Sequence, residues 1–184
     1  MALDINKIID GCLKGDTICQ ERLYKLLAPK LMGVCLRYVK ARQEAEDCLQ
    51  EAFIKIFGSL VTFKKDGVIE AWARKVTVNI LITYLKSNRR FREAQDVEEL
   101  KEEIEGVNES EVSIQAHDLL IVLNQLPESY KNIFNLYVIE GYNHKEISEL
   151  TGITESSSRT YLTRAKQMLV EIHRSINRSH AETA

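Results

Sequence analysis

Hydroxyl and guanidinium side chains gather near the C-terminal end of this 184-residue chain, at a spacing that places them on one face of a helix. The six residues are Ser156, Ser157, Arg159, Thr160, Thr163 and Arg164. Such groups hydrogen-bond to phosphate oxygens and to base edges in the major groove of DNA. We therefore interpret this face as a candidate DNA-binding surface. Three polar residues that precede it extend the candidate set: His144, Lys145 and Thr154.

The segment from Asn143 to Ile172 also contains the elements that must position this face. Asn143 followed three residues later by Glu146 is a capping-box pattern, which predicts the start of a short helix. Gly152 would form the turn, and Thr154 would cap the next helix. The buried stripe of that helix is predicted to comprise Ser158, Leu162, Ala165, Leu169 and Ile172. The pattern predicts a helix-turn-helix, although glycine-linked helix pairs also occur in proteins that never bind nucleic acid.

Charge is distributed unevenly along the chain, whose formal net charge is −2. Residues 96–112 contain eight acidic side chains and one basic one, so this segment carries −7 and the remainder carries +5. A run of like charge with little to bury favours a solvated linker. The positive remainder allows basic faces on the two flanking domains.

Apolar residues recur at helical spacing on both sides of this linker, and strand signals are absent. With 45% hydrophobic residues, the chain has enough apolar side chains for two small cores. We predict an all-α protein with a helical domain at 1–93, an acidic linker at 94–112, a second helical domain at 113–178 and a tail at 179–184. In the second domain, a regular amphipathic helix is expected from Tyr130 to Val138, ending at Gly141.

The helix predicted from 44 to 56 has a stripe beside its apolar one, composed of Asp47, Gln50, Glu51 and Ile54. This stripe is either a protein-docking face or an ordinary solvated acidic face. The helix predicted after Gly67 has an inner stripe of Ile69, Ala73, Val76, Ile80 and Tyr84. Its outer stripe is polar and basic, and comprises Lys75, Asn79, Thr83, Lys86 and Arg90, with Arg89 beside it. The basic end suits a phosphate backbone, or it is a solvated helix end that favours the helix dipole.

The polar segment 62–70, which precedes that helix, is a candidate site for unpaired DNA. A loop can form a pocket for a base turned out of its stack, which a packed helix face cannot. The candidate contacts here are Thr62, Phe63, Lys64, Lys65 and Trp72. A lone tryptophan at helical spacing is nevertheless more often part of a core than a stacking surface.

Other classes of function receive little support from the sequence. The four cysteines, at positions 12, 19, 35 and 48, form no CxxC pair and lie mostly on apolar helical phases, so we expect reduced, buried thiols and no metal or cofactor. The histidines lack matching carboxylate or cysteine arrangements, and no phosphate-binding loop is visible, so we expect neither an enzyme nor a small-molecule substrate. No apolar run long enough to span a membrane and no secretion leader are present, which predicts a cytoplasmic protein without direct membrane insertion.

Three segments resemble the extracytoplasmic-function group of sigma-70 type sigma factors. EAEDCLQEAFIKIF, Glu44 to Phe57, resembles the polymerase-binding helix of that group. Its D-x-x-Q-E-x-F signature is matched by Asp47, Gln50, Glu51 and Phe53. EAWARKVTVNILITYLKSNRR, Glu70 to Arg90, resembles the promoter-melting and −10-reading helices, with Trp72, Arg74 and Asn79 in the expected places. The stretch from Leu126 to Leu169 resembles the −35-reading domain, so that the matches leave out little besides the linker and the tail.

The resemblance implies a factor without catalysis of its own that binds the RNA polymerase core and promoter DNA. The residues 47, 50, 51, 53 and 54 would contact the core, the first domain would read and open the −10 element, and the second would read the −35 element. The family also implies an anti-sigma factor as a partner.

Three positions depart from the family pattern: Thr83 where an aspartate is common, Ser158 where valine is usual, and Tyr161 where a basic or polar residue is frequent. A hydroxyl on a buried stripe is expected to cost roughly 1 kcal/mol unless it is hydrogen-bonded. A competing interpretation remains, a conventional helix-turn-helix regulator whose N-terminal domain dimerises or senses a ligand. It predicts palindromic DNA sites that are bound without polymerase.

Overall fold

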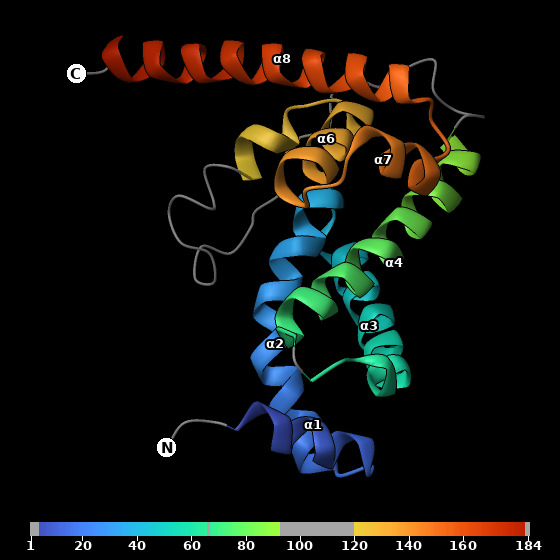
Figure 1. The fold of residues 1–184 in the computed structure, drawn as a ribbon. Coiled ribbons are helices and arrows are strands. Elements are labelled where there is room, and N and C mark those ends of the chain that lie inside the picture. Colours follow the sequence, from blue (N-terminus) through green and yellow to red (C-terminus); the bar gives the residue numbers. More distant parts are fainter. Residues whose placement is uncertain (1–3, 66, 93–119, 183–184) are drawn as a thin grey trace. The chain divides into compact units, whose positions relative to one another are not determined.

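The computed structural model describes residues 4–65, 67–92 and 120–182, without the side chains at 88–92 and 173–182 (Figure 1). All regular structure in these ranges is helical, which confirms the predicted all-α class. The chain divides into two compact units, Met1–Val107 and Asn108–Ala184. The predicted linker at 94–112 lies outside the described residues. The division between the two units falls within its range.

The first unit is built from α1 (Ile5–Leu13), α2 (Thr17–Tyr38), α3 (Arg42–Ser59), the 3-10 turn η1 (Leu60–Thr62) and α4 (Ile69–Arg92). Helices α2, α3 and α4 pack against one another, and α1 packs against α2. The reversal between α1 and α2 depends on Gly15, whose φ of +82° is readily adopted only by glycine. Asp16 then caps α2, because its carboxylate accepts hydrogen bonds from the backbone N–H of Ile18 and Cys19.

Helix α2 continues through Pro29 without ending. Proline lacks an N–H and removes one hydrogen bond from a helix interior. The ring of Pro29 is exposed, while the opposite side of the helix buries Leu23, Leu27 and Leu31 at intervals of four residues. Apolar burial along this face outweighs the local cost of the proline.

The buried side of α4 differs from the predicted inner stripe. Ile69 and Ala73 are buried as expected, but Val76, Ile80 and Tyr84 are only partly buried. The fully buried positions further along are Thr77, Val78, Leu81 and Ile82. The prediction was wrong by about one residue because α4 packs against both α2 and α3, which buries a wider arc than one stripe. Thr77 is tolerated there because its hydroxyl donates to the Ala73 carbonyl at 2.9 Å.

The second unit contains a helical segment at 120–124, then α6 (Glu128–Phe134), the π-helical turn η2 (Asn135–Ile139), α7 (His144–Thr151) and α8 (Glu155–Glu182). Leu123, Leu126 and Ala165 form its buried centre, and apolar groups of α6 and α8 pack around them. The end of α8 at Glu182 lies beyond 178, so the helix runs through most of the predicted tail.

The regular helix expected from Tyr130 to Val138 is wrong in its second half. After Phe134 the helix widens into η2, where the N–H of Glu140 donates to the carbonyl of Asn135 at 2.9 Å. The wider turn buries Leu136 and leaves Tyr137 37% and Val138 48% exposed. Gly141 then ends the element with a φ of +79°, as its position in the sequence predicts.

Candidate nucleic-acid and protein interfaces

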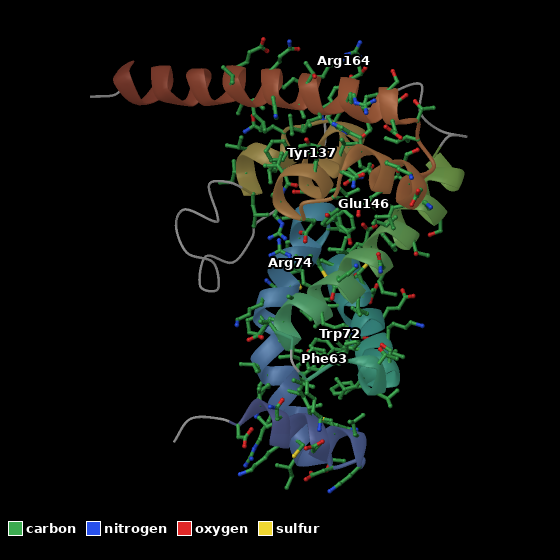
Figure 2. All side chains as sticks on the ribbon, in the orientation of Figure 1. Phe63, Trp72, Arg74, Tyr137, Glu146 and Arg164 are labelled. Atoms are coloured by element: carbon green, nitrogen blue, oxygen red, sulfur yellow. The ribbon has the colours of Figure 1, made fainter. Side chains whose placement is uncertain are left out.

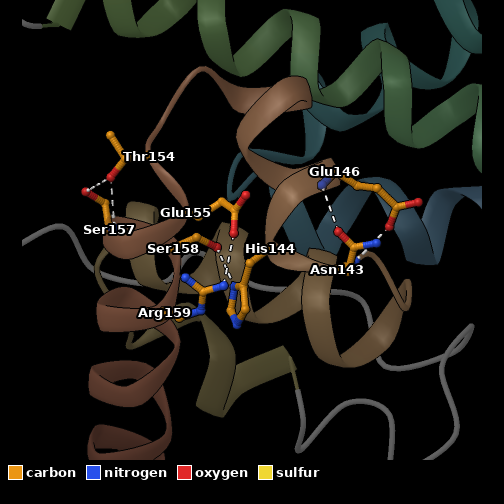
Figure 3. Close-up of polar contacts among 8 residues, drawn as sticks. All are labelled: Asn143, His144, Glu146, Thr154, Glu155, Ser157, Ser158 and Arg159. Atoms are coloured by element: carbon orange, nitrogen blue, oxygen red, sulfur yellow. Dashed lines mark hydrogen bonds and ion pairs between the residues drawn. The ribbon is translucent and has the colours of Figure 1, made fainter.

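The helix-turn-helix of α7 and α8 is formed by the local interactions that the sequence predicts. The Asn143 side chain accepts from the N–H of Glu146 at 2.9 Å, and the Glu146 carboxylate accepts from the N–H of Asn143 at 2.8 Å (Figure 3). Gly152 has a φ of +80°, and the Thr154 hydroxyl accepts from the N–H of Ser157 at 3.1 Å. These contacts confirm the capping box, the glycine turn and the second cap of a helix-turn-helix.

The outer face of α8 brings most of the predicted DNA-binding residues together. Its exposed residues are Ser156, Arg159, Thr160, Thr163 and Arg164, and Ser157 is half-buried beside them. Leu162 and Ala165 are buried on the opposite side, and Leu169 and Ile172 are partly buried. Lys145 and Thr154 are also exposed. We call the set Ser156, Arg159, Thr160, Thr163 and Arg164 the α8 outer face.

Several groups of the α8 outer face are held by neighbours. The Thr160 hydroxyl donates to the Ser156 carbonyl at 3.1 Å, and the Thr163 hydroxyl donates to the Arg159 carbonyl at 3.0 Å. These hydroxyl oxygens therefore face a partner mainly as acceptors. Arg159 pairs with Glu155 one turn earlier at 2.9 Å (Figure 3), an exposed contact that is worth little by itself.

His144 is the first residue of α7, and its side chain is half-buried against α8. Its Nδ1 is 2.9 Å from the hydroxyl of Ser158, which is completely buried (Figure 3). Its ring is stacked on Tyr137 of η2, with centroids 4.5 Å apart. Burial lowers the pKa of His144, and the positive charge of Arg159 lowers that pKa further. One nitrogen of this predicted DNA contact is therefore engaged inside the domain.

The two departures within α8 have clear structural roles. The Ser158 hydroxyl finds its partner in His144 of the other helix, so the predicted cost of an unpartnered buried hydroxyl does not arise. Tyr161 is half-buried and packs against Tyr130 of α6, with ring centroids 5.4 Å apart. Tyr161 is therefore part of the packing between α6 and α8.

Helix α3 presents four of the five predicted core-binding residues on its exposed side. Asp47, Gln50 and Glu51 are exposed, and Ile54 is 75% exposed. Phe53 points the other way: it is only 5% exposed, and its ring lies 4.5 Å from that of Tyr24. Phe53 is thus part of the core beneath the stripe, and we call Asp47, Gln50, Glu51 and Ile54 the α3 face.

The polar stripe on α4 is exposed as predicted at Lys75, Asn79, Thr83 and Lys86. The side chains of Arg89 and Arg90 lie outside the described ones. The Thr83 hydroxyl donates to the carbonyl of Asn79 at 2.9 Å, so it is held against its own helix.

The segment before α4 is anchored on both sides. Phe63 and Trp72 are half-buried and pack against each other, with centroids 5.6 Å apart (Figure 2). The Thr62 hydroxyl donates to the Ser59 carbonyl at 2.7 Å. Lys64 is exposed, whereas Lys65 pairs with Asp10 of α1.

Sequence reasoning missed Asp10 and Tyr130 as partners of candidate residues. Tyr130 accepts a hydrogen bond from Arg164, which lies 34 residues further along the chain, at 3.0 Å. Asp10 pairs with Lys65 across a separation of 55 residues. Spacing along one helix carries no signal for either contact, since both join separate elements.

The described residues contain four free cysteines, with Cys12, Cys35 and Cys48 buried and Cys19 half-buried. Burial raises the pKa of Cys35 to about 12 and that of Cys48 to about 11, so both thiols stay protonated at neutral pH. Within the same ranges, no group of three or more histidine, cysteine or acidic residues is arranged to hold a metal ion. Nor is any helix there both long and apolar enough to cross a membrane.

Both units of the chain match family models of sigma-70 factors. Residues 23–91 match the family described as sigma-70 region 2, and residues 117–169 match the family described as sigma-70, region 4. The first match spans most of α2, α3 and nearly all of α4, and the second contains α6, α7 and the first half of α8. The α3 face and the α8 outer face lie within them.

Whole proteins of the same kind align over most of the chain. RNA polymerase sigma factor SigV of Bacillus subtilis is 31% identical over 133 residues, which cover 72% of this chain and 77% of SigV. The ECF RNA polymerase sigma-E factor of Haemophilus influenzae is 25% identical over 88% of this chain and 91% of its own length.

A solved structure shares the fold. The sigma factor RpoE of Bartonella quintana, solved with the anti-sigma factor NepR, aligns with a TM-score of 0.53 and 17% identity over 84% of this chain and 96% of its own. Together, the two matched regions and these relatives show that the chain belongs to the extracytoplasmic-function (ECF) subfamily of sigma-70 type RNA polymerase sigma factors, and that it is an alternative sigma factor directing promoter-specific transcription initiation.

Proposed function

We propose that this sigma factor reads the −35 element with the α8 outer face, reads and opens the −10 element with α4 and the segment before it, and binds the polymerase core with the α3 face. The observation that carries the proposal is the exposure of Arg159, Thr160, Thr163 and Arg164 on one side of a helix capped by Thr154. A face of this composition, on the second helix of a helix-turn-helix, suits the major groove. The helix N-terminus adds favourable electrostatics for a phosphate.

The −10 element is assigned to the first domain. Lys75, Asn79 and Lys86 are exposed along one side of α4 and would follow the edge of the duplex. In the segment before α4, Phe63 packs against Trp72 and supplies an aromatic surface, and Lys64 adds an exposed positive charge next to it. We assign capture of an extruded base to this segment, where stacking offsets the cost of taking the base out of the duplex.

The α3 face has the composition of a protein-binding site. A large aliphatic side chain that is 75% exposed, Ile54, lies beside the acidic residues Asp47 and Glu51. Burying Ile54 against a partner would remove its apolar surface from water, and the carboxylates would set the orientation. The family resemblance assigns this partner as the clamp helices of the largest polymerase subunit. Phe53 contributes from inside, by holding the helix against the domain core.

The same proposal includes a cytoplasmic protein that performs no catalysis itself and is regulated by an anti-sigma factor. Regulation of this kind is supported by the fold shared with the Bartonella quintana protein, which was solved with such a partner. An anti-sigma factor that covers the α3 face or the α8 outer face would block core or promoter binding.

Run-off transcription with purified polymerase core and a promoter library tests the proposal. We expect the core and this chain together, without any other sigma factor, to initiate from asymmetric promoters that contain two elements. Arg159→Ala should reduce initiation at promoters that depend on the −35 element. The matched control is Lys25→Ala, because Lys25 is an exposed helical base that also pairs with a glutamate one turn away, Glu21. Binding to palindromic sites without polymerase would instead identify a conventional regulator.

Core binding is tested separately by placing a charge on the α3 face. Ile54→Asp should weaken the affinity for the polymerase core by tenfold or more. Tenfold corresponds to a loss of about 1.4 kcal/mol in binding free energy, which is typical of a residue at the centre of an interface. Ile18→Asp is the control, because Ile18 is another isoleucine on a helix and is 60% exposed. Equal core affinity of the two variants would remove the α3 face from the proposal.

A further inference from the structure

Arg164 on the α8 outer face is held by a tyrosine from another helix. Its Nη1 donates to the hydroxyl oxygen of Tyr130 in α6 at 3.0 Å. Figure 2 labels Arg164 on α8, where its side chain is exposed. The bond uses one N–H of the guanidinium group and leaves the others available for a phosphate oxygen or a base edge.

Tyr130 is itself held in place by two contacts. Its ring packs against Tyr161 at 5.4 Å between centroids, and its body packs on the buried cluster of Leu123, Leu126 and Ala165. The phenol oxygen therefore projects from a packed ring instead of from a mobile side chain. Tyr161 and Arg164 lie three residues apart on α8, so that one turn of this helix contacts Tyr130 twice, through a ring and through a hydrogen bond.

Arginine has many rotamers in solution, and fixing them during binding opposes association. A hydrogen bond that already exists in the free protein removes part of this entropic cost. The tyrosine hydroxyl is neutral, so it orients the guanidinium group without cancelling the positive charge that DNA requires. A carboxylate partner, such as the one Arg159 has in Glu155, would compete with phosphate for the same charge.

We infer that Tyr130 and Tyr161 are positioning residues that preorder Arg164 for the −35 element, and that they contribute to the selectivity of this sigma factor without touching DNA themselves. The inference rests on the proposed assignment of the α8 outer face to the −35 element. It identifies one use for Tyr161, which stands where a basic or polar residue is frequent in the family: a direct contact at 161 is replaced by indirect control of the residue at 164.

The test is a mutant cycle in polymerase holoenzyme, with promoter affinity measured for an intact and a scrambled −35 element. Tyr130→Phe removes the hydroxyl and keeps the ring contact with Tyr161. We expect it to reduce the preference for the intact element by roughly two- to tenfold, the effect of one hydrogen bond. Arg164→Ala should reduce this preference further, and the double variant should match Arg164→Ala, because Tyr130 acts only through Arg164.

A second readout separates positioning from stability. Relaxation of the Arg164 Nε–Hε group, measured by NMR in the free full-length chain, should show an ordered guanidinium group in the wild type and a mobile one in Tyr130→Phe. Tyr142→Phe is the control, since Tyr142 is a half-buried tyrosine of the same domain whose charged neighbours are Glu140 and Glu146 and not Arg164. It should change neither the mobility of Arg164 nor the promoter preference.

The outcomes distinguish this inference from the proposal beneath it. If Arg164→Ala lowers the preference for the −35 element while Tyr130→Phe behaves as wild type, the positioning role is overturned and the assignment of the α8 outer face stands. Additive effects of the two substitutions would also overturn it. If Arg164→Ala itself leaves the preference unchanged, the DNA contact of Arg164 and the positioning role both fail.

Discussion

In the second domain, a serine occupies a position on the buried stripe of α8. Ser158 occupies a buried position on α8, and His144 of α7 supplies the hydrogen bond that a buried hydroxyl requires. Tyr137 stacks on the other side of the imidazole. His144 of α7 thus contacts both η2 and α8.

Protonation of His144 is expected to weaken its contacts with Ser158 and Tyr137. Its pKa is lowered in the folded state by burial and by Arg159, so the folded protein disfavours the charged imidazole. Its contribution to stability is therefore fully present above the unfolded pKa of about 6.5 and is lost as the pH falls through the lower folded value.

An NMR titration of the His144 ring in the full chain should give a pKa below about 6.5. The stability of the second domain should fall as the pH drops below about 6.5, and His144→Gln should flatten this dependence. A His144 ring that titrates at or above the ordinary value would contradict the expectation.

The thiols of the first domain give an independent check on its packing. The raised pKa values of Cys35 and Cys48, about 12 and about 11, leave almost no thiolate at pH 8, and Cys12 is buried as well. We expect a thiol-specific disulfide reagent to modify only the half-buried Cys19 of the native chain within minutes. All four cysteines should react in denaturant. Rapid modification of Cys35 in the native chain, which a Cys35→Ala variant would identify, would show that this core opens on the timescale of the reaction.

At the scale of elements, the helix-turn-helix is held at its turn by backbone geometry. Gly152 adopts a φ of +80°, and no atom outside the turn approaches the position of a Cβ there. An added methyl group at position 152 is therefore opposed by conformation and not by crowding.

Gly152→Ala is expected to destabilise the second domain by about 1 kcal/mol, because the left-handed conformation is strained for alanine. Urea unfolding followed by circular dichroism measures the change. Gly33→Ala is a control of opposite sign, since Gly33 lies inside α2 with space for a Cβ and alanine favours helix by about 0.5 to 1 kcal/mol. If the two substitutions shifted stability in the same direction, the turn would not be the cause.

Over the whole molecule, charge is distributed unevenly along the sequence. The chain is formally at −2, yet its residues outside 96–112 carry +5. Most of this positive charge lies in the first matched region: residues 23–91 carry +7, whereas residues 117–169 carry −1. A modest positive balance suits a protein that reads DNA only after the polymerase has placed it, since tight independent binding to any DNA would compete with promoter search.

Promoter binding by the holoenzyme should weaken as salt concentration rises, because bound cations are released from each contacted phosphate. If Arg159 contacts a phosphate, Arg159→Ala should reduce the slope of log affinity against log salt by about one, and Lys25→Ala should leave it unchanged. An unchanged slope together with altered sequence preference would place Arg159 on a base edge instead. Unchanged slope and unchanged preference would exclude Arg159 from the interface.

Features that depend only on neighbours within one turn of a helix follow from the sequence alone. Four such features are the capping box at Asn143, the glycine turn at Gly152, the cap at Thr154 and the exposed stripe on α3. They depend on hydrogen bonds between residues one to four positions apart and on helical periodicity. The helical class follows from the same periodicity, and the order of the motifs predicted the family.

Where two elements meet, the direction in which a side chain points depends on tertiary packing. Helix α4 packs against two helices, which changes the side that it buries, and the π-helical turn leaves Tyr137 exposed. Phe53 of the polymerase-binding signature is buried in the core of the first domain. The bonds from Ser158 to His144 and from Arg164 to Tyr130 join residues 14 and 34 positions apart. No periodicity within one helix encodes such contacts, because they depend on how two separately formed helices pack, and packing is set by the volume and shape of all the side chains between them.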